Sequence, residues 1–289
     1  MALFLPGRAH DALNRLLRVM PLSTRALMRL LIAWVGRRYG QEGYLCLDDV
    51  VIEKAFAKRL LWRAKRSCAP GAYHTKLKLA EIMLKEVLGS GLKARYIVFH
   101  THYSAGWFTK TLTRMSLVWV GTLHPRAIVY WRGKRCSVGE LAGRLPLKWR
   151  KRLGVRATTV RLYAPKYGSL RLVVTRNRHS NHEYILTNEL EADLSAVVLR
   201  KVSRWQVETR FRDTKQYAGL EACQCRVDQA MVRHVGLVLL TFVVLQMMRR
   251  SVEESLGSVK ERWQLEVMRD SESPPPLLKA CPPHLRATA

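Results

Sequence analysis

The order of apolar segments between residues 44 and 123 is the feature that most constrains the fold of this chain. Residues 44–52 (YLCLDDVVI) are apolar on both faces apart from two acids near their end, which is typical of a buried strand. Residues 75–88 are predicted to form an amphipathic helix, and residues 95–99 a second strand. The apolar stripe of this helix is expected to consist of Leu77, Leu79, Met83, Leu84 and Leu88. A helix at 105–115 and a strand at 117–123 follow, and this β-α-β-α-β order predicts an α/β layer with parallel neighbouring strands.

The pattern changes after residue 127. Short alternating strands are expected at 158–163, 170–175 and 183–187, so a β-rich insertion is predicted. Helical segments flank this region at 8–38 and 193–250, and a Pro-rich stretch after residue 270 predicts a disordered tail. The expected organisation is an N-terminal helical segment (1–42), the first part of an α/β core (43–126), the β-rich insertion (127–190), a helical C-terminal part of the core (191–252) and a partly disordered tail (253–289).

Net charge indicates the class of partner. The 289 residues include 50 Lys and Arg against 22 Asp and Glu, which gives a formal net charge of +28. Such a balance favours a polyanion, because Lys and Arg displace counterions from phosphates. An anionic membrane surface is the competing partner, but no basic amphipathic anchor is evident.

The cysteines and the most apolar run indicate the compartment. Six cysteines are spaced in a way that fits no common zinc module, which favours a reduced, cytoplasmic chain with buried thiols. The most apolar run, residues 235–248, is expected to be too short to span a bilayer and is interpreted as a core helix. We therefore expect no membrane partner and a cytoplasmic, nucleoid-associated location.

A single carboxylate lies between two cations at helical spacing near the C-terminal third of the chain. On a helix, Glu208 lies about 40° around the axis from Arg204, and Lys215 about 20° from Arg204, so all three share one face. A metal-dependent phosphoryl-transfer site needs such an acid for the metal and such cations for phosphate. The alternative is a solvated helix face with ordinary ion pairs.

The run Arg-x3-Glu-x6-Lys followed by Gly-Leu resembles the third-acid signature of bacterial insertion-sequence transposases of the DDE type. That signature reads Tyr-x2-Arg-x3-Glu-x6-Lys, and Lys201 stands at its Tyr position here. The resemblance implies an α/β fold with a ribonuclease H-like core, a β-rich insertion and helical N- and C-terminal segments. It also implies strand cleavage and transfer at insertion-sequence ends, with Mg²⁺ or Mn²⁺ as cofactor. The implied partner is double-stranded DNA, both transposon ends and target, with a homodimer as the candidate assembly.

The same resemblance assigns the site residues. The run Leu47-Asp48-Asp49-Val50 matches the first acid at Asp49, so Asp49 and Glu208 are expected to bind the metal. Arg204 and Lys215 are expected to hold phosphate or to position Glu208. Asp48 points to the opposite strand face from Asp49 and is therefore set aside.

Two departures predict an impaired copy. The second-acid position is His100, and imidazole is a poor magnesium ligand. Residues 52–75 contain no pair of alternating apolar strands, although the family places two strands there. An internal deletion near 63–72 is the preferred interpretation, and a shorter but intact variant is the alternative.

Basic residues of the insertion are candidates for contact with nucleic acid, and a solvated face is the alternative. The predicted nucleic-acid-binding residues are Lys148, Arg150, Lys151, Arg152, Arg204 and Lys215. Three functions remain open: an impaired DDE transposase, a non-catalytic DNA-binding remnant of one, and a basic RNA-associated protein. The distance between Asp49 and Glu208 separates the first two from the third.

Overall fold

The computed structural model describes residues 15, 17–19, 21, 23–39, 43–48, 73–177, 182–223, 227–251 and 253–269. Three predictions lie outside these residues: the position of Asp49, the deletion near 63–72 and the tail after 269. The described residues form two compact units. One, the sheet unit, lies between Met28 and Arg210, and the other, the helical unit, contains residues up to Leu27 and from Phe211 onward.

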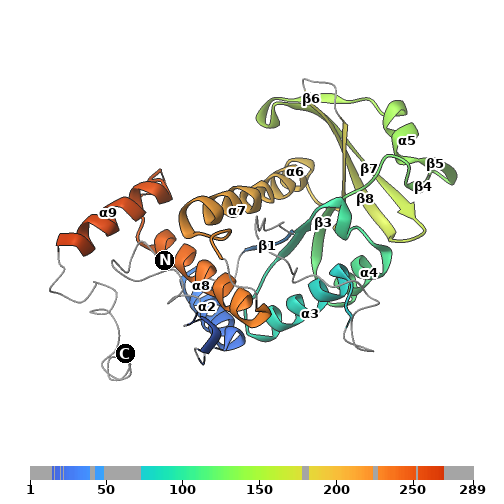
Figure 1. The fold of residues 1–289 in the computed structure, drawn as a ribbon. Helices are drawn as coiled ribbons and strands as arrows, with labels where there is room; N and C mark the ends of the chain where they lie inside the picture. The colour runs from blue at the N-terminus through green and yellow to red at the C-terminus, as the bar shows by residue number, and fades with distance from the viewer. Residues whose placement is uncertain are drawn as a thin grey trace. The chain divides into compact units, whose positions relative to one another are not determined.

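The sheet unit is built on one mixed sheet (Figure 1). Its strands are β1 (Tyr44–Leu47), β2 (Tyr96–Phe99), β3 (Val118–Thr122), β4 (Ile128–Trp131), β5 (Lys134–Ser137), β6 (Lys148–Arg150), β7 (Val155–Ala164), β8 (Gly168–Arg176) and β9 (His182–Thr187). The order is β1-β2-β3-β9-β8-β7-β4-β5, and β6 pairs with β7. β1, β2 and β3 are parallel, as the sequence predicts, whereas the other pairings are antiparallel. The predicted β-rich insertion therefore continues the core sheet through the β3–β9 pairing.

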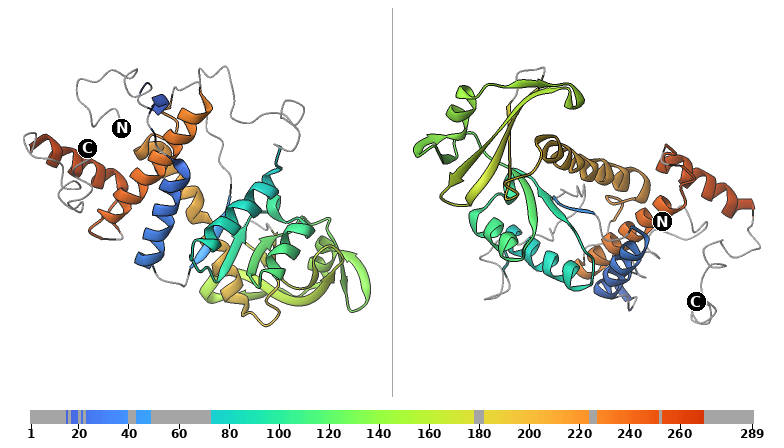
Figure 2. Two further views of the ribbon diagram at one scale, coloured as in Figure 1. Left: turned by 90° about the horizontal axis from the view of Figure 1, so that it is seen from below. Right: turned by 180° about the vertical axis from the view of Figure 1, so that it is seen from behind.

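Helices cover the parallel part of this sheet on both faces (Figure 2). Across both units, the helices of the described residues are α2 (Thr24–Tyr39), α3 (Lys76–Gly89), α4 (Gly106–Arg114), α5 (Val138–Arg144), α6 (Leu194–Ser203), α7 (Trp205–Ala218), α8 (Asp228–Met247) and α9 (Leu256–Arg269), with 3-10 turns η3 (Thr101–Tyr103) and η4 (Lys151–Leu153). Of these, α3, α4 and α6 pack on the parallel part of the sheet. On one face, α3 and α4 pack against a cluster that includes Phe99 and Trp119. On the other face, α6 packs through Val197 against Val98. The architecture is thus mixed α/β.

The face that α3 buries differs from the predicted stripe. Leu79 and Met83 are 38% and 63% exposed, whereas Leu84 is buried. The reason is that the predicted stripe combined two helix faces, and packing selected the one that includes Glu81. This acid tolerates the interface because Lys78 and Lys85 donate to it at 2.8 and 2.6 Å.

In the helical unit, α8 is longer than the predicted apolar run at residues 235–248. The helix begins at Asp228, well before residue 235, and Gln229–Met247 is long and apolar enough to cross a membrane by length and composition alone. It is nevertheless 39% buried within the protein. Met231 packs with Leu17, and Leu245 packs with Val259. These contacts suit the predicted core helix.

A buried cation ties α8 to the N-terminal residues of the helical unit. Arg233 is 7% exposed, and its NH1 group donates to the carbonyl oxygens of Leu17 and Arg18 at 2.8 and 2.9 Å. Both acceptors are main-chain oxygens near the end of a helical stretch, where the helix dipole favours a cation. Arg233 therefore supplies hydrogen bonds to two main-chain carbonyls.

Candidate functional site

The site lies where the parallel strands β1 and β2 end. Leu47 is opposite Phe99 in the ladder, so Asp48 and His100 follow at neighbouring positions on the same sheet edge. Strand side chains alternate, and Cys46 and Val98 face the α6 side of the sheet. Asp48 and His100 each lie two residues after one of these, so alternation places them on the same face, toward the helices that follow β9.

Arg204 joins two acids from distant parts of the chain. It lies between α6 and α7, and its NH1 group donates to Asp48 Oδ2 at 2.5 Å. Its NH2 group donates to Glu208 Oε1 at 2.8 Å, which agrees with the expectation that the two residues share one helix face. The side chains of Arg204 and Asp48 are only 11% and 15% exposed, which limits screening of this charge pair by solvent. One guanidinium therefore pairs with two carboxylates.

His100 lies in the field of this cluster. Burial lowers the pKa of His100, and the nearby Arg204 guanidinium lowers it further, while Asp48 and Glu208 act in the opposite direction. Its ring meets that of His102 edge-to-face, with 5.1 Å between centroids. The net direction keeps His100 neutral at neutral pH, so it adds no charge to the site.

Cys46 and Arg210 extend the cluster along the α6 side. Burial raises the pKa of the Cys46 thiol, and the positive charges of Arg210 and Arg204 oppose that effect. The thiol therefore stays protonated at neutral pH and behaves as a small apolar side chain beneath the acids.

Lys215 forms an ion pair with Glu221. Its Nζ lies 2.6 Å from Glu221 Oε1, a contact made within the helical unit. Its side chain is 32% exposed. The predicted role of Lys215 toward phosphate stays a prediction.

The described side chains do not fit a divalent metal ion. Within the described ranges, no group of three or more His, Cys, Asp or Glu side chains is arranged to hold one. The oxygens of Asp48 and Glu208 that face inward already accept hydrogen bonds from Arg204. Magnesium prefers several hard oxygen ligands, and His100 supplies a nitrogen instead. Asp49, the predicted ligand, lies outside the described residues.

Asp48 is the site residue that the sequence interpretation missed. Which of two adjacent acids faces a helix depends on the phase of the strand pleat, and that phase follows from pairing with β2. The sequence did show that Asp48 lies on the same strand face as Cys46. This would have identified Asp48 only if the face of β1 that helices cover had been known.

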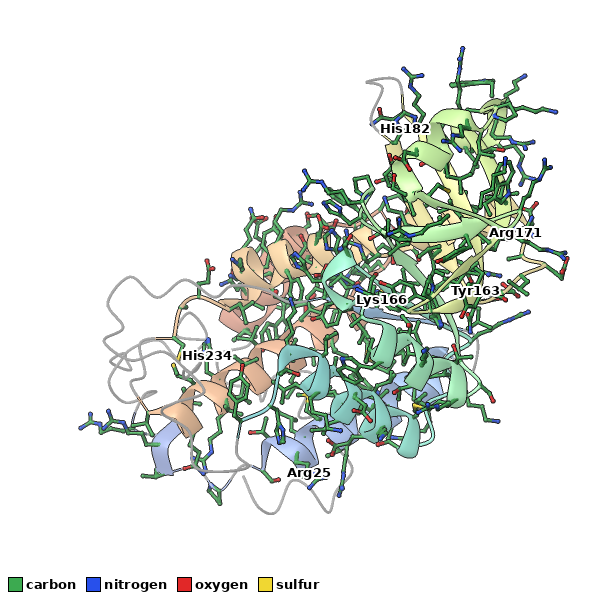
Figure 3. All side chains as sticks on the ribbon, turned by 90° about the vertical axis from the view of Figure 1, so that its right-hand side faces the viewer. Arg25, Tyr163, Lys166, Arg171, His182 and His234 are labelled. Carbon is green, nitrogen blue, oxygen red and sulfur yellow. The ribbon has the colours of Figure 1, made fainter. Side chains whose placement is uncertain are left out.

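The predicted basic residues of the insertion are all accessible. Lys148 and Arg150 lie on β6 and Lys151 and Arg152 on η4, and each is exposed. Figure 3 shows many side chains with nitrogen ends projecting outward from this part of the sheet, near His182. Their exposure agrees with the predicted role and leaves nucleic-acid binding itself as a prediction.

Comparisons with known proteins leave the family open. No protein-family model matches the chain, and no curated protein matches it. Among solved structures, it is similar to the piggyBac transposase in a synaptic complex with hairpin DNA, determined by cryo-EM. The identity is 14%, the TM-score is 0.35, and the match covers 75% of this chain. This chain spans 45% of that transposase, and a likeness of this size establishes neither family nor activity.

Proposed function

We propose that this chain is a DNA-binding protein of the DDE insertion-sequence transposase type, with a ribonuclease H-like core and impaired cleavage chemistry. The observation that carries this proposal is the hydrogen bond from Arg204 to Asp48, which joins residues 156 positions apart. It brings the Arg-x3-Glu motif to the end of β1, next to the end of β2 that carries the His100 position.

The arrangement has the topology that phosphoryl transfer on nucleic acid requires. Carboxylates from separate elements must meet at one place, and here a strand end supplies Asp48 and a helix supplies Glu208. The resemblance pointed independently to the end of β1, to His100 and to Glu208. Ordinary surface ion pairs on a solvated helix would not require this meeting.

The same arrangement accounts for the proposed loss of chemistry. Arg204 pairs with the two described carboxylates, and His100 stands where the resemblance expects the second acid. The residues of this chain would then hold the helix to the sheet edge and hold DNA through their charge. Such a protein would act in the cytoplasm on the nucleoid, with a homodimer as the proposed assembly on DNA.

Duplex binding tests the proposal. Fluorescence anisotropy with a labelled duplex, repeated over a range of salt concentrations, should give a steep linear fall of log affinity with log salt. Each lost phosphate contact should reduce that slope by about 0.9. Replacing Lys148, Arg150, Lys151 and Arg152 together by Gln should therefore flatten the slope, whereas Lys134→Gln with Arg135→Gln should change it less. An affinity that does not respond to salt would overturn the proposal.

A further inference from the structure

A row of four exposed side chains crosses the end of the sheet that β5, β4, β7 and β8 form. At its centre, Tyr130 of β4 is opposite Tyr163 of β7. Arg135 of β5 is opposite Tyr130 on one side, and Ser169 of β8 is opposite Tyr163 on the other. Directly opposite residues of antiparallel strands share one face, so these four side chains make up one surface, the tyrosine face. All four are exposed, Tyr130 by 37% and Tyr163 by 50%.

The reverse face of the same strands is buried. Val129 of β4 and Leu162 of β7 belong to the core cluster that also contains Leu141 of α5, and Figure 1 shows α5 beside β4 and β5. Helix α6 packs on the same side of the sheet as the tyrosines, but farther along β7, where Ala157 is buried. In the part of the chain that the structure describes, the tyrosine face is therefore open to solvent.

The two tyrosine rings contact each other without covering each other. Their centroids are 6.4 Å apart, and the ring planes are tilted by 57°. A cross-strand aromatic pair of this kind stabilises the sheet, which accounts for the contact between the rings but not for their exposure. The tilt leaves ring surface available to a further planar group, such as a nucleobase.

The charge around the tyrosine face favours a polyanion over a second copy of this chain. Residues 127–190 contain 14 Lys and Arg against 3 Asp and Glu. Some of these cations have acidic neighbours, since Arg161 pairs with Glu191 and Arg135 lies within electrostatic reach of Glu140. The excess remains large after such pairs are counted. Two copies that met through this surface would bring like charges together, whereas a nucleic acid would complement them.

The width of the row separates a single strand from a duplex. Three strand spacings span about 14 Å, whereas the major groove is about 12 Å wide and admits a helix or a two-stranded ribbon. A four-stranded face cannot enter the groove, so its rings would not reach the bases of a duplex. In a single strand the base faces are accessible, and stacking on aromatic side chains is a common mode of binding.

We propose that the tyrosine face binds single-stranded DNA. One base stacks on Tyr130 and a neighbouring base stacks on Tyr163, while the positive charge around the face attracts the phosphates. The inference rests on the proposed function as a DNA-binding protein, and it adds the form of DNA and the residues that contact the bases.

Anisotropy with the full chain tests this inference, using a labelled oligothymidine and a duplex of equal length. Tyr163→Ala should weaken oligothymidine binding by roughly 5- to 100-fold, because one base loses its stacking partner. The same change should leave duplex binding within about 2-fold, since paired bases do not reach the ring. Equal weakening of the two forms of DNA would overturn the inference.

Tyr44→Ala is the matched control for Tyr163→Ala. Tyr44 is also an exposed strand tyrosine (49%), and its ring also contacts another, that of Tyr96, at a centroid distance of 5.4 Å. It lies on β1, at the other end of the sheet order. Oligothymidine affinity should stay within about 2-fold in this variant. Equal losses in the two variants would show that any exposed tyrosine has this effect, which would contradict the assignment to the tyrosine face.

Tyr163→Phe separates stacking from a structural or hydroxyl effect. Phenylalanine keeps the ring, so oligothymidine affinity should stay within about 2-fold of the wild type. A loss as large as that of Tyr163→Ala would mean that the hydroxyl, and not the ring, makes the contact, and the stacking inference would fall.

Photocrosslinking of the wild-type chain provides a test that does not depend on a variant keeping its fold. An oligothymidine that carries 5-iododeoxyuridine is irradiated in the complex, and the crosslinked peptides are mapped by mass spectrometry. Crosslinks should map to Tyr130 or Tyr163. Crosslinks confined to other residues would contradict the inference.

Failure of the inference and failure of the proposed function are distinguishable. Salt-dependent duplex binding with no effect of Tyr163→Ala on oligothymidine would refute the inference and leave the proposed function standing. Oligothymidine binding through the tyrosine face without any duplex binding would do the reverse. Tighter binding of oligouridine than of oligothymidine would contradict the assignment to DNA. A dimer without DNA that Tyr163→Ala dissociates, measured by sedimentation, would show that a second copy occupies this face.

Discussion

Arg204 is the residue on which the candidate site depends. It contacts an acid at the end of β1 and an acid on α7, and little of its side chain reaches solvent. Removing one member of a buried ion pair is costly because the remaining charges lose their partner. The guanidinium therefore contributes to stability as well as to the geometry of the site.

Arg204→Met should lower the free energy of unfolding by about 1–3 kcal/mol, because Asp48 and Glu208 lose the guanidinium that they share. Urea denaturation would measure this. Lys201→Met is the control, since its partner Glu183 is 49% exposed and such pairs contribute less than about 1 kcal/mol. If the two variants lost the same free energy of unfolding, the ion pairs of Arg204 would contribute no more than an ordinary surface ion pair.

His100→Asp tests the second-acid position. A third carboxylate beside Asp48 and Glu208 should add the oxygen ligand and negative charge that a divalent ion requires, so Mn²⁺ affinity should rise above that of the wild type. Isothermal titration with Mn²⁺ would measure it, with His102→Asp as a control that adds the same charge two positions along the chain. Equally tight binding by the wild type would show that the second acid lies elsewhere.

For single residues, the sequence predicted which side chains share a helix face better than which partners they contact on other elements. The contact between Arg204 and Glu208 follows from helical geometry, which placed both residues on one face. The contact with Asp48 depends on how β1 pairs with β2, which no local pattern reveals. Lys215 shows the same limit, because its partner Glu221 lies in a turn after α7.

Among the elements, α6 sets the position of Arg204. This helix begins after Asp193, whose carboxylate accepts a hydrogen bond from the Ala196 N–H at 3.0 Å. It ends at Ser203, directly before Arg204. The Asp193 cap stabilises the start of α6. The Arg204 ion pair, which follows its end, holds the helix over the sheet.

Asp193→Ala should destabilise the protein by about 1 kcal/mol at neutral pH through loss of the cap. The backbone hydrogen bond from Ala196 lowers the pKa of Asp193 in the folded state. Its stabilising contribution is therefore present above the ordinary aspartate pKa of about 3.9 and is lost as pH falls through the lower folded value. Urea denaturation at several pH values should show the gap between variant and wild type closing in acid.

Asp193→Ser provides the control for this experiment. Serine keeps a capping oxygen without a titrating charge, so its stability relative to Asp193→Ala should not vary with pH. A gap between wild type and Asp193→Ala that stays constant down to strong acid would mean that the carboxylate charge plays no part in the cap.

The elements themselves were predicted where local periodicity was sufficient. β1, β2 and β3, and the helices between them, lie close to their predicted ranges. Two predictions were wrong for tertiary reasons. α3 buries the face with Glu81, because its lysine partners neutralise that acid. α8 starts at Asp228, before the apolar run, because the preceding residues, including the buried Arg233, are part of the same helix. The joining of the insertion to β3 depends on long-range pairing and could not be predicted from local pattern.

For the whole molecule, net charge bears on binding of a polyanion, whereas the geometry of the site bears on cleavage. The charge of +28 favours a polyanion whether or not the chain can cleave it. The Arg204 cluster and His100 are the features that bear on cleavage chemistry. Binding and cleavage are therefore expected to be uncoupled in this protein.

Nicking of supercoiled plasmid by the full chain is the most direct test of this account. The assay should be run with Mg²⁺ and with Mn²⁺, at low salt and at protein concentrations that saturate the DNA in a parallel binding measurement. The account predicts that the plasmid is bound and stays supercoiled. Nicking that depends on the metal ion and disappears in Glu208→Gln would contradict it, because the site would then be catalytically complete despite His100.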